Sequence, residues 1–134
     1  MSKTILKIKT NGESFINITD QIKSIELSGD GVLYLFLPHT SCALCISEAF
    51  DPDAISDVNL FMQQLAPRNL KFIKHKTEGP DDSPSHMKSI LLHQTITLLV
   101  EQGKIILGQW QGVFLAEFRD GIHHREIFVK YCQD

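Results

Sequence analysis

The sequence of 134 residues lacks several features that mark large classes of protein. Its 13 Lys and Arg residues are outnumbered by 16 Asp and Glu residues, which gives a net charge of −3. A basic excess is typical of proteins that bind nucleic acid or acidic membranes, and none is present here. The longest apolar stretches, such as Val32 to Leu37, are far too short to cross a bilayer. We therefore expect neither nucleic acid nor a membrane as a partner.

Cysteine is also scarce, with three residues in the chain. An odd number of cysteines fits no disulfide framework and suits a reducing compartment. The first ten residues, MSKTILKIKT, alternate polar and apolar side chains and lack the apolar core of a signal peptide. These features predict a cytoplasmic protein.

The composition itself is that of a globular domain, with 43% hydrophobic and 22% charged residues. We find no internal repeat and no linker. The densest group of turn-forming residues, Glu78 to Pro84, divides the chain into halves that are each small for a core, so we interpret it as an internal loop. Residues 1–134 are predicted to form a single domain.

Strand-like segments dominate the chain. Tight-turn signals at Asn11-Gly12, Gln102-Gly103 and Asp120-Gly121 favour antiparallel neighbours. The predicted strands are 4–9, 14–18, 32–37, 43–46, 95–100, 104–107, 113–118 and 126–130, and 72–74 is expected to be extended. The pattern predicts an α+β domain of antiparallel β-sheets with about three short helices.

Three helix starts are visible. Thr19-Asp20 is expected to cap a short helix that buries isoleucines on one face. Asp51-Pro52 combines a capping carboxylate with proline at the first helical position, and that helix should run to about Leu65. Ser83-Pro84 repeats the signal, and its helix should carry His86 and His93 on one side.

The polar segment from His75 to His86 holds two histidines and three carboxylates in twelve residues. Imidazole and carboxylate groups are donors for divalent metals. His86 is expected in the first turn of its helix, where the dipole favours the neutral imidazole and where a phosphate could also bind. Composition alone leaves two interpretations open, a metal site and a solvated loop with capping acids.

Other candidates are weaker on their own. His39 follows the most apolar run and fits either a site at the core edge or, preferably, a histidine bonded to backbone. Gln111, beside the single tryptophan, could contact a ligand, although packing of Trp110 is favoured. Arg125 could grip an anion or lie in an exposed charged turn, and the turn is favoured.

Cys42 and Cys45 form a C-x-x-C motif within β-type residues. A strand would place the two side chains on opposite faces, so we interpret them as buried thiols and not as a redox pair. Asp57 in the second helix is interpreted as a surface acid.

Three blocks in this order resemble the YjbQ-like family, which is named for secondary thiamine-phosphate synthase activity. They cover the chain from about residue 5 to about residue 130. The blocks are His39-Thr40-Ser41-Cys42-Ala43 with Glu48, Asp51-Pro52-Asp53 and Asp57; His75, Glu78, Gly79, Asp82 and His86; and Leu107-Gly108, Trp110-Gln111-Gly112, Glu117 and Arg125. The chain departs from the family pattern at Cys42, at Ser47 and Ala49, where asparagines are common, and at His93, where glycine is common.

The resemblance implies a compact α+β domain that assembles as a homotrimer. It also implies a cleft in which His39, His75 and His86 converge on a divalent metal ion with an open position, zinc being the first expectation. The implied activity is weak joining of hydroxymethylpyrimidine diphosphate to thiazole phosphate. Because that reaction releases pyrophosphate, magnesium is the alternative ion.

The resemblance also implies roles for the remaining site residues. Glu48 and Asp82 would be the catalytic residues that organise the site together with the metal, and Arg125 would bind an anion. Gln111, Thr40 and Ser41 would contact the substrate, a small phosphorylated metabolite. Two alternatives stay open: a non-catalytic trimeric module that binds a phosphorylated metabolite or a metal, and a metal-assisted phosphate-ester hydrolase.

Overall fold

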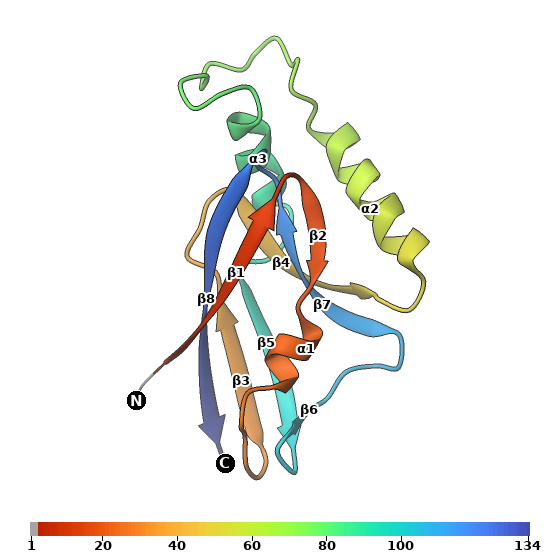
Figure 1. Cartoon of the computed structure of the whole chain (residues 1–134), viewed down its shortest axis with the longest axis vertical. Helices are drawn as coiled ribbons and strands as arrows, with labels where there is room; N and C mark the ends of the chain where they lie inside the picture. The colour runs from red at the N-terminus through yellow and green to blue at the C-terminus, as the bar shows by residue number, and fades with distance from the viewer. Residues whose placement is uncertain (1–2) are drawn as a thin grey trace.

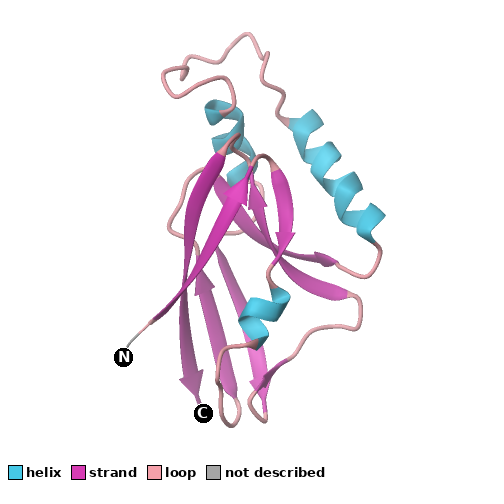
Figure 2. Ribbon diagram, in the orientation of Figure 1, coloured by secondary structure: helices cyan, strands magenta, loops and turns pink. Residues whose placement is uncertain are grey.

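The computed structural model describes residues 3–134, which form eight β-strands and three α-helices in one compact domain (Figures 1 and 2). This confirms the predicted α+β class with antiparallel sheets. The elements are β1 (Thr4–Asn11), β2 (Ser14–Asn17), α1 (Thr19–Lys23), β3 (Gly31–Phe36), β4 (Cys42–Glu48), α2 (Pro52–Leu65), α3 (Asp82–Ser89), β5 (Thr95–Glu101), β6 (Lys104–Ile105), β7 (Gln111–Glu117) and β8 (Ile122–Gln133). In the described part of the chain, no helix has the length and apolarity needed to span a membrane.

The strands make two antiparallel sheets, one in the order β1-β8-β3-β5-β6 and one in the order β2-β7-β4. Only β5 and β6 are neighbours both in sequence and in a sheet. They are joined by the predicted Gln102-Gly103 hairpin, in which both residues have positive φ angles of 49° and 75°, as a two-residue type I′ turn requires.

The predicted hairpin at Asn11-Gly12 is wrong in its pairing, although the turn itself exists. β1 pairs with β8, and β2 pairs with β7 in the other sheet. The amide of Gly12 donates to the carbonyl oxygen of Gly121 at 2.9 Å, so the turns at Gly12 and Gly121 lie against each other. Both are corners where the chain passes from one sheet to the other, and the local sequence signal of such a corner equals that of a hairpin.

The main core lies between the two sheets. Ile18 precedes α1 as its N-cap residue, in place of the cap expected at Thr19-Asp20, and Ile22 lies within the helix; both are fully buried in this core. A second cluster lies between the three-stranded sheet and α2, where Met62 packs near Phe118. The three-stranded sheet is therefore covered on both faces, which explains why β7 is buried from Gly112 to Glu117.

The helices differ in how well the sequence predicts them. α2 begins as expected, because the Asp51 side chain accepts a hydrogen bond from the amide of Asp53 at 3.0 Å. α3 begins at Asp82, before the predicted start, and ends at Ser89, so His93 lies outside the helix. Residues 72–74 form no strand. The early start of α3 moves Asp82 into its first turn and His86 into its last turn.

Candidate metal centre

The loop before α3 and the helix itself bring together His75, Asp82 and His86. One donor atom from each of these residues lies within 4.8 Å of the other two. The Nε2 atoms of His75 and His86 are 2.7 Å and 3.1 Å from the same oxygen, Oδ2 of Asp82. Asp82 is 3% exposed, whereas the two imidazoles are partly open to solvent. The result is a buried carboxylate beneath two accessible rings at one end of the molecule, where α3 lies (Figure 1).

The second ring nitrogen of His86 fixes how this ring presents its donor atom. Nδ1 lies 2.8 Å from the carbonyl oxygen of Thr40, and a carbonyl can only accept, so Nδ1 carries the hydrogen. In a neutral imidazole Nε2 is then a bare acceptor, and it faces the acceptor Oδ2 of Asp82. Two acceptors at this distance require a cation between them, which is either a proton on Nε2 or a metal ion.

The other oxygen of Asp82 is held by Arg119, which the sequence analysis did not single out. Arg119 Nη1 lies 2.9 Å from Asp82 Oδ1, Nε donates to Asp81 Oδ2 at 2.7 Å, and Nη2 donates to the carbonyl oxygen of Glu78 at 3.0 Å. Arg119 stands in no recognisable motif, so only its position after β7 could have indicated this role.

Asp82 is ionised in this setting. Burial raises the pKa of the Asp82 carboxyl, but hydrogen bonds from His75 and His86 and the charges of His86 and Arg119 outweigh burial. The net pKa lies below its ordinary value. The site thus combines an ionised carboxylate with two imidazoles whose Nε2 atoms lie next to its Oδ2 atom.

His39 does not join this group, which corrects the expected set of three histidines. Its Nε2 accepts a hydrogen bond from the amide of Glu126 at 3.0 Å, so backbone occupies that lone pair. Burial, followed by the charge of Arg125, lowers the pKa of His39. The backbone-bonded interpretation is therefore confirmed, and Asp82 takes the place in the cluster that was expected for His39.

His39 nevertheless lies close to the centre, because it lines one cavity together with Thr40 and His86. The cavity has a volume of about 810 Å³ and a mainly apolar wall that includes Phe36 and Ile90. Gln94 also lines it, and its Oε1 is buried with no hydrogen-bond partner among the described residues, while its Nε2 donates to the Ser89 carbonyl oxygen at 3.2 Å. The cavity thus offers apolar contact and one free acceptor.

Arg125 is neither exposed nor free to grip an anion in the expected way. It is 7% exposed, and its Nε and Nη2 donate to the two carboxylate oxygens of Glu117 at 2.7 Å and 2.6 Å. Nη2 also donates to Ser41 Oγ at 2.9 Å, so Ser41 contacts Arg125 inside the protein. Burial would lower the pKa of Arg125, but the hydrogen bond to Glu117 helps to raise it above its ordinary value, which keeps the pair charged.

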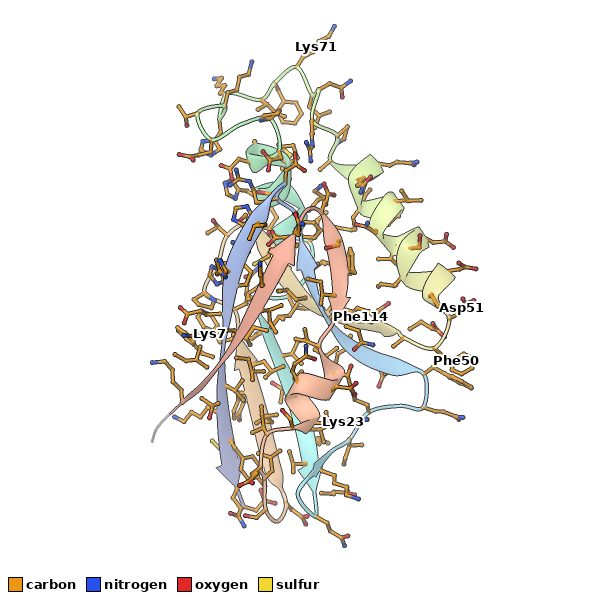
Figure 3. All side chains as sticks on the ribbon, in the orientation of Figure 1. Lys7, Lys23, Phe50, Asp51, Lys71 and Phe114 are labelled. Carbon is orange, nitrogen blue, oxygen red and sulfur yellow. The ribbon has the colours of Figure 1, made fainter. Side chains whose placement is uncertain are left out.

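Glu48 and Gln111 lie at the other end of the three-stranded sheet, away from the metal donors. They face each other at the far ends of β4 and β7, six register positions from the Cys42–Glu117 pair, which corresponds to roughly 20 Å. Glu48 accepts from the amide of Asp51, and Gln111 accepts from the amide of Gly108. Figure 3 shows the neighbouring Phe50 and Asp51 on this side of the molecule. Within one chain neither residue can act at the candidate centre, which corrects the expected grouping.

Comparisons with known proteins agree with this architecture. The family model described as UPF0047 protein YjbQ-like matches residues 4–134. A UPF0047 protein of Synechocystis sp. is 40% identical, with coverage of 93% of this chain and 87% of the relative. A UPF0047 protein of Methanocaldococcus jannaschii is 37% identical, with coverage of 96% and 92%.

Solved structures show the same fold. A conserved hypothetical protein from Thermus thermophilus superposes with a TM-score of 0.88 at 40% identity, covering 96% of this chain and 99% of that one. A YjbQ/UPF0047 family protein from Clostridium acetobutylicum superposes with a TM-score of 0.83 at 32% identity over the same shares. The chain therefore belongs to the UPF0047 YjbQ-like family.

Proposed function

We propose that His75, Asp82 and His86 bind a divalent metal ion and that the chain uses this ion to act on a small phosphorylated metabolite. The observation that carries the proposal is the His86 ring, whose Nδ1 is committed to Thr40 while its Nε2 faces the Asp82 carboxylate. Two imidazoles and one carboxylate are donors found in open catalytic zinc sites. Magnesium prefers oxygen donors, so zinc or a similar transition metal is the better fit.

The chain's own residues prepare this site in four ways. Arg119 holds Oδ1 of Asp82 and leaves Oδ2 for the ion, and Thr40 orients the His86 ring. The apolar cavity beside His86 receives the body of the substrate, and Gln94 accepts a hydrogen bond from it. When bound, the ion would polarise a phosphoryl oxygen and neutralise the charge that develops on a departing phosphate or pyrophosphate.

Anion contacts would come from the loop that carries His75, because Arg125 is committed to Glu117. His75 lines a second cavity, of about 420 Å³, together with Arg68, Lys71 and Lys76. Lys71 stands at the outer end of this loop in Figure 3. A phosphate there would lie beside positive charge on one side and beside the ion on the other.

The first test measures metal binding directly. Purified protein is stripped with a chelator and titrated with Zn²⁺ against a competing dye. We expect one ion per chain, and affinity reduced by a hundredfold or more in His86→Ala and in Asp82→Asn, because each loses a ligand. His93→Ala is the matched control, since His93 is exposed and lies outside the cluster. Unchanged affinity in both ligand variants would falsify the site.

The second test separates the activities. The zinc-loaded protein is incubated with hydroxymethylpyrimidine diphosphate and thiazole phosphate, and products are separated chromatographically. Joined product that disappears with chelator and in Asp82→Asn supports the transferase. Phosphate release without joining favours the hydrolase, and tight binding without any product favours the non-catalytic module.

The homotrimer implied by the resemblance is part of the same proposal. Its support in this chain is the outer face of the five-stranded sheet, where Tyr34, Phe36 and Leu99 remain about half exposed. These side chains alternate with buried residues along β3 and β5, so they form an apolar surface that a second copy could cover.

A further inference from the structure

We infer that the buried ion pair between Glu117 and Arg125 is a positioning device for the metal centre. The inference rests on the proposed function, and it concerns two residues whose hydrogen bonds and ion pairs go to none of the three candidate metal donors. Glu117 is fully buried and Arg125 is 7% exposed. Glu117 is the last residue of β7, and Arg125 lies near the start of β8.

Both carboxylate oxygens of Glu117 accept hydrogen bonds. Oε1 accepts from Thr10 Oγ1 at 2.6 Å and from Arg125 Nε at 2.7 Å. Oε2 accepts from Arg125 Nη2 at 2.6 Å and from the amides of Phe118 and Arg119 at 3.0 Å and 3.1 Å. Five hydrogen bonds hold this carboxylate in its orientation and tie it to the main chain at Phe118 and Arg119.

The pair reaches the metal centre through Ser41. Arg125 Nη2 donates to Ser41 Oγ at 2.9 Å, and the amide of Phe118 donates to the Ser41 carbonyl oxygen at 3.3 Å. Ser41 directly follows Thr40, whose carbonyl oxygen holds Nδ1 of His86. A shift of Ser41 would carry that carbonyl with it and release the His86 ring.

The pair reaches the centre a second time through Arg119. Glu117 Oε2 accepts from the Arg119 amide, and the guanidinium of the same residue holds Oδ1 of Asp82. One ion pair therefore fixes the orientation of two of the three metal donors.

Stability alone gives a poor reason for this arrangement. Replacing a buried ion pair by apolar residues of similar size is often neutral or stabilising, because desolvation offsets the attraction between the charges. Orientation of the metal ligands explains the ion pair better. Loss of a hydrogen bond that orients a metal ligand typically lowers metal affinity by 10–100-fold.

The experiment uses the full chain with two readouts. The first is the ¹H–¹⁵N signal of His86 Nδ1–H in metal-free protein, which is visible only while Thr40 protects this hydrogen from exchange. The second is Co²⁺ affinity together with the visible absorption spectrum of the Co²⁺ protein, which reports ligand geometry. The variants are Arg125→Lys and Glu117→Gln, with Ser41→Ala as a milder change that removes only one contact of Arg125. Leu115→Ala is the control, because it opens a cavity in the core next to β7 and removes none of the hydrogen bonds of Glu117, Arg125 and Ser41.

We expect Arg125→Lys and Glu117→Gln to lose the His86 signal and to bind Co²⁺ at least tenfold more weakly with an altered spectrum. Ser41→Ala should show a smaller change in the same direction. If Arg125→Lys and Glu117→Gln fail to fold, the Ser41→Ala result alone tests the inference. Leu115→Ala should lower Tm but keep both readouts. Folded network variants that keep the signal and the wild-type spectrum, or equal losses in Leu115→Ala, would overturn the inference. Should the wild-type chain bind no Co²⁺ while Arg125→Lys still loses the His86 signal, the metal proposal fails and the positioning role stands.

Discussion

At the scale of single residues, the role of His86 depends on two neighbours, one of them far away in sequence. Thr40, from the segment between β3 and β4, takes one ring nitrogen, and Asp82, one helical turn earlier, faces the other. The pair Asp82 and His86 has the i, i+4 spacing that places two side chains on the same helical face. Local spacing therefore supplies two of the donors, while orientation comes from a long-range contact.

This difference explains how much of the site the sequence could predict. His75, Asp82 and His86 fall within twelve residues, so their clustering indicates a candidate site, although composition alone leaves a solvated loop equally open. The inclusion of His39 failed because its ring nitrogen is occupied by the amide of Glu126, a contact across 87 positions that no local pattern encodes. The role expected for Arg125 failed for a different reason, because its carboxylate partner Glu117 is buried at the end of the preceding strand, β7.

The thiols of Cys42 and Cys45 should be inert in the native protein. Burial raises the pKa of Cys42 to about 12 and the pKa of Cys45 to about 11, so both remain protonated at pH 8. We expect iodoacetamide at pH 8 to leave both unmodified by mass spectrometry, whereas the partly exposed Cys132 reacts first. Unfolding in guanidinium is the control and should make all three react. Rapid native labelling of Cys42 would contradict its placement in the core.

Glu117 should make stability depend on pH. Burial raises its pKa, but hydrogen bonds from Arg125 and Thr10 outweigh burial, and the net pKa lies below the ordinary 4.5. The stabilisation is therefore fully present above pH 4.5 and is lost as the pH falls through the lowered pKa. We expect Glu117→Gln to cost about 3–5 kcal/mol at pH 7, because Arg125 stays buried without its partner.

Urea denaturation from pH 7 to pH 3 measures this dependence. Glu117→Gln should show a shallower loss of unfolding free energy below pH 4.5 than the natural chain. Glu101→Gln, at an exposed position of β5, should match the natural chain throughout. A wild-type slope in Glu117→Gln would mean that other carboxylates account for the acid sensitivity.

At the scale of elements, the start of α2 illustrates what local sequence can determine. Asp51 caps the helix and Pro52 occupies its first position, as the pattern predicts. No side chain in the described part of the chain caps α3, which begins at Asp82, one residue before the predicted Ser83-Pro84 start. The turn signal at Gly103 predicts its hairpin correctly, whereas the signals at Gly12 and Gly121 mark real turns but not the strands that pair, because that pairing depends on residues far along the chain.

Removal of the Asp51 cap should weaken α2 measurably. Asp51→Ala loses the hydrogen bond to the amide of Asp53, and such a loss typically costs about 1 kcal/mol. The unfolding free energy from chemical denaturation is the measurement. Asp57→Ala is the control, since Asp57 is exposed in the middle of the same helix and should change stability little. Equal effects of the two substitutions would show that charge, and not capping, is responsible.

At the scale of the whole molecule, the two sheets are covered unequally. The three-stranded sheet has the other sheet on one face and α2 on the other, while the outer face of the five-stranded sheet has no cover from this chain's described residues. That face exposes Tyr34, Phe36 and Leu99, whose apolar surface would be buried by assembly with other copies. The resemblance implies three copies.

Light scattering should therefore give a mass three times the 15.2 kDa of one chain. Tyr34→Glu should lower that mass, because a charge would be placed in an apolar contact, whereas Leu60→Glu on the exposed side of α2 should leave it unchanged. A single-chain mass for the natural protein in dilute solution would remove the trimer from the proposal.

The order of strands has a consequence for how the protein is made. β1 precedes every other strand of the domain, yet its only sheet neighbour within residues 3–134 is β8, which ends at Gln133. A nascent chain on the ribosome must therefore keep β1 without its partner until almost all of the domain has emerged. Pairing over such separations is slow compared with hairpin closure. During this interval the unpaired edge of β1 is open to pairing with other chains.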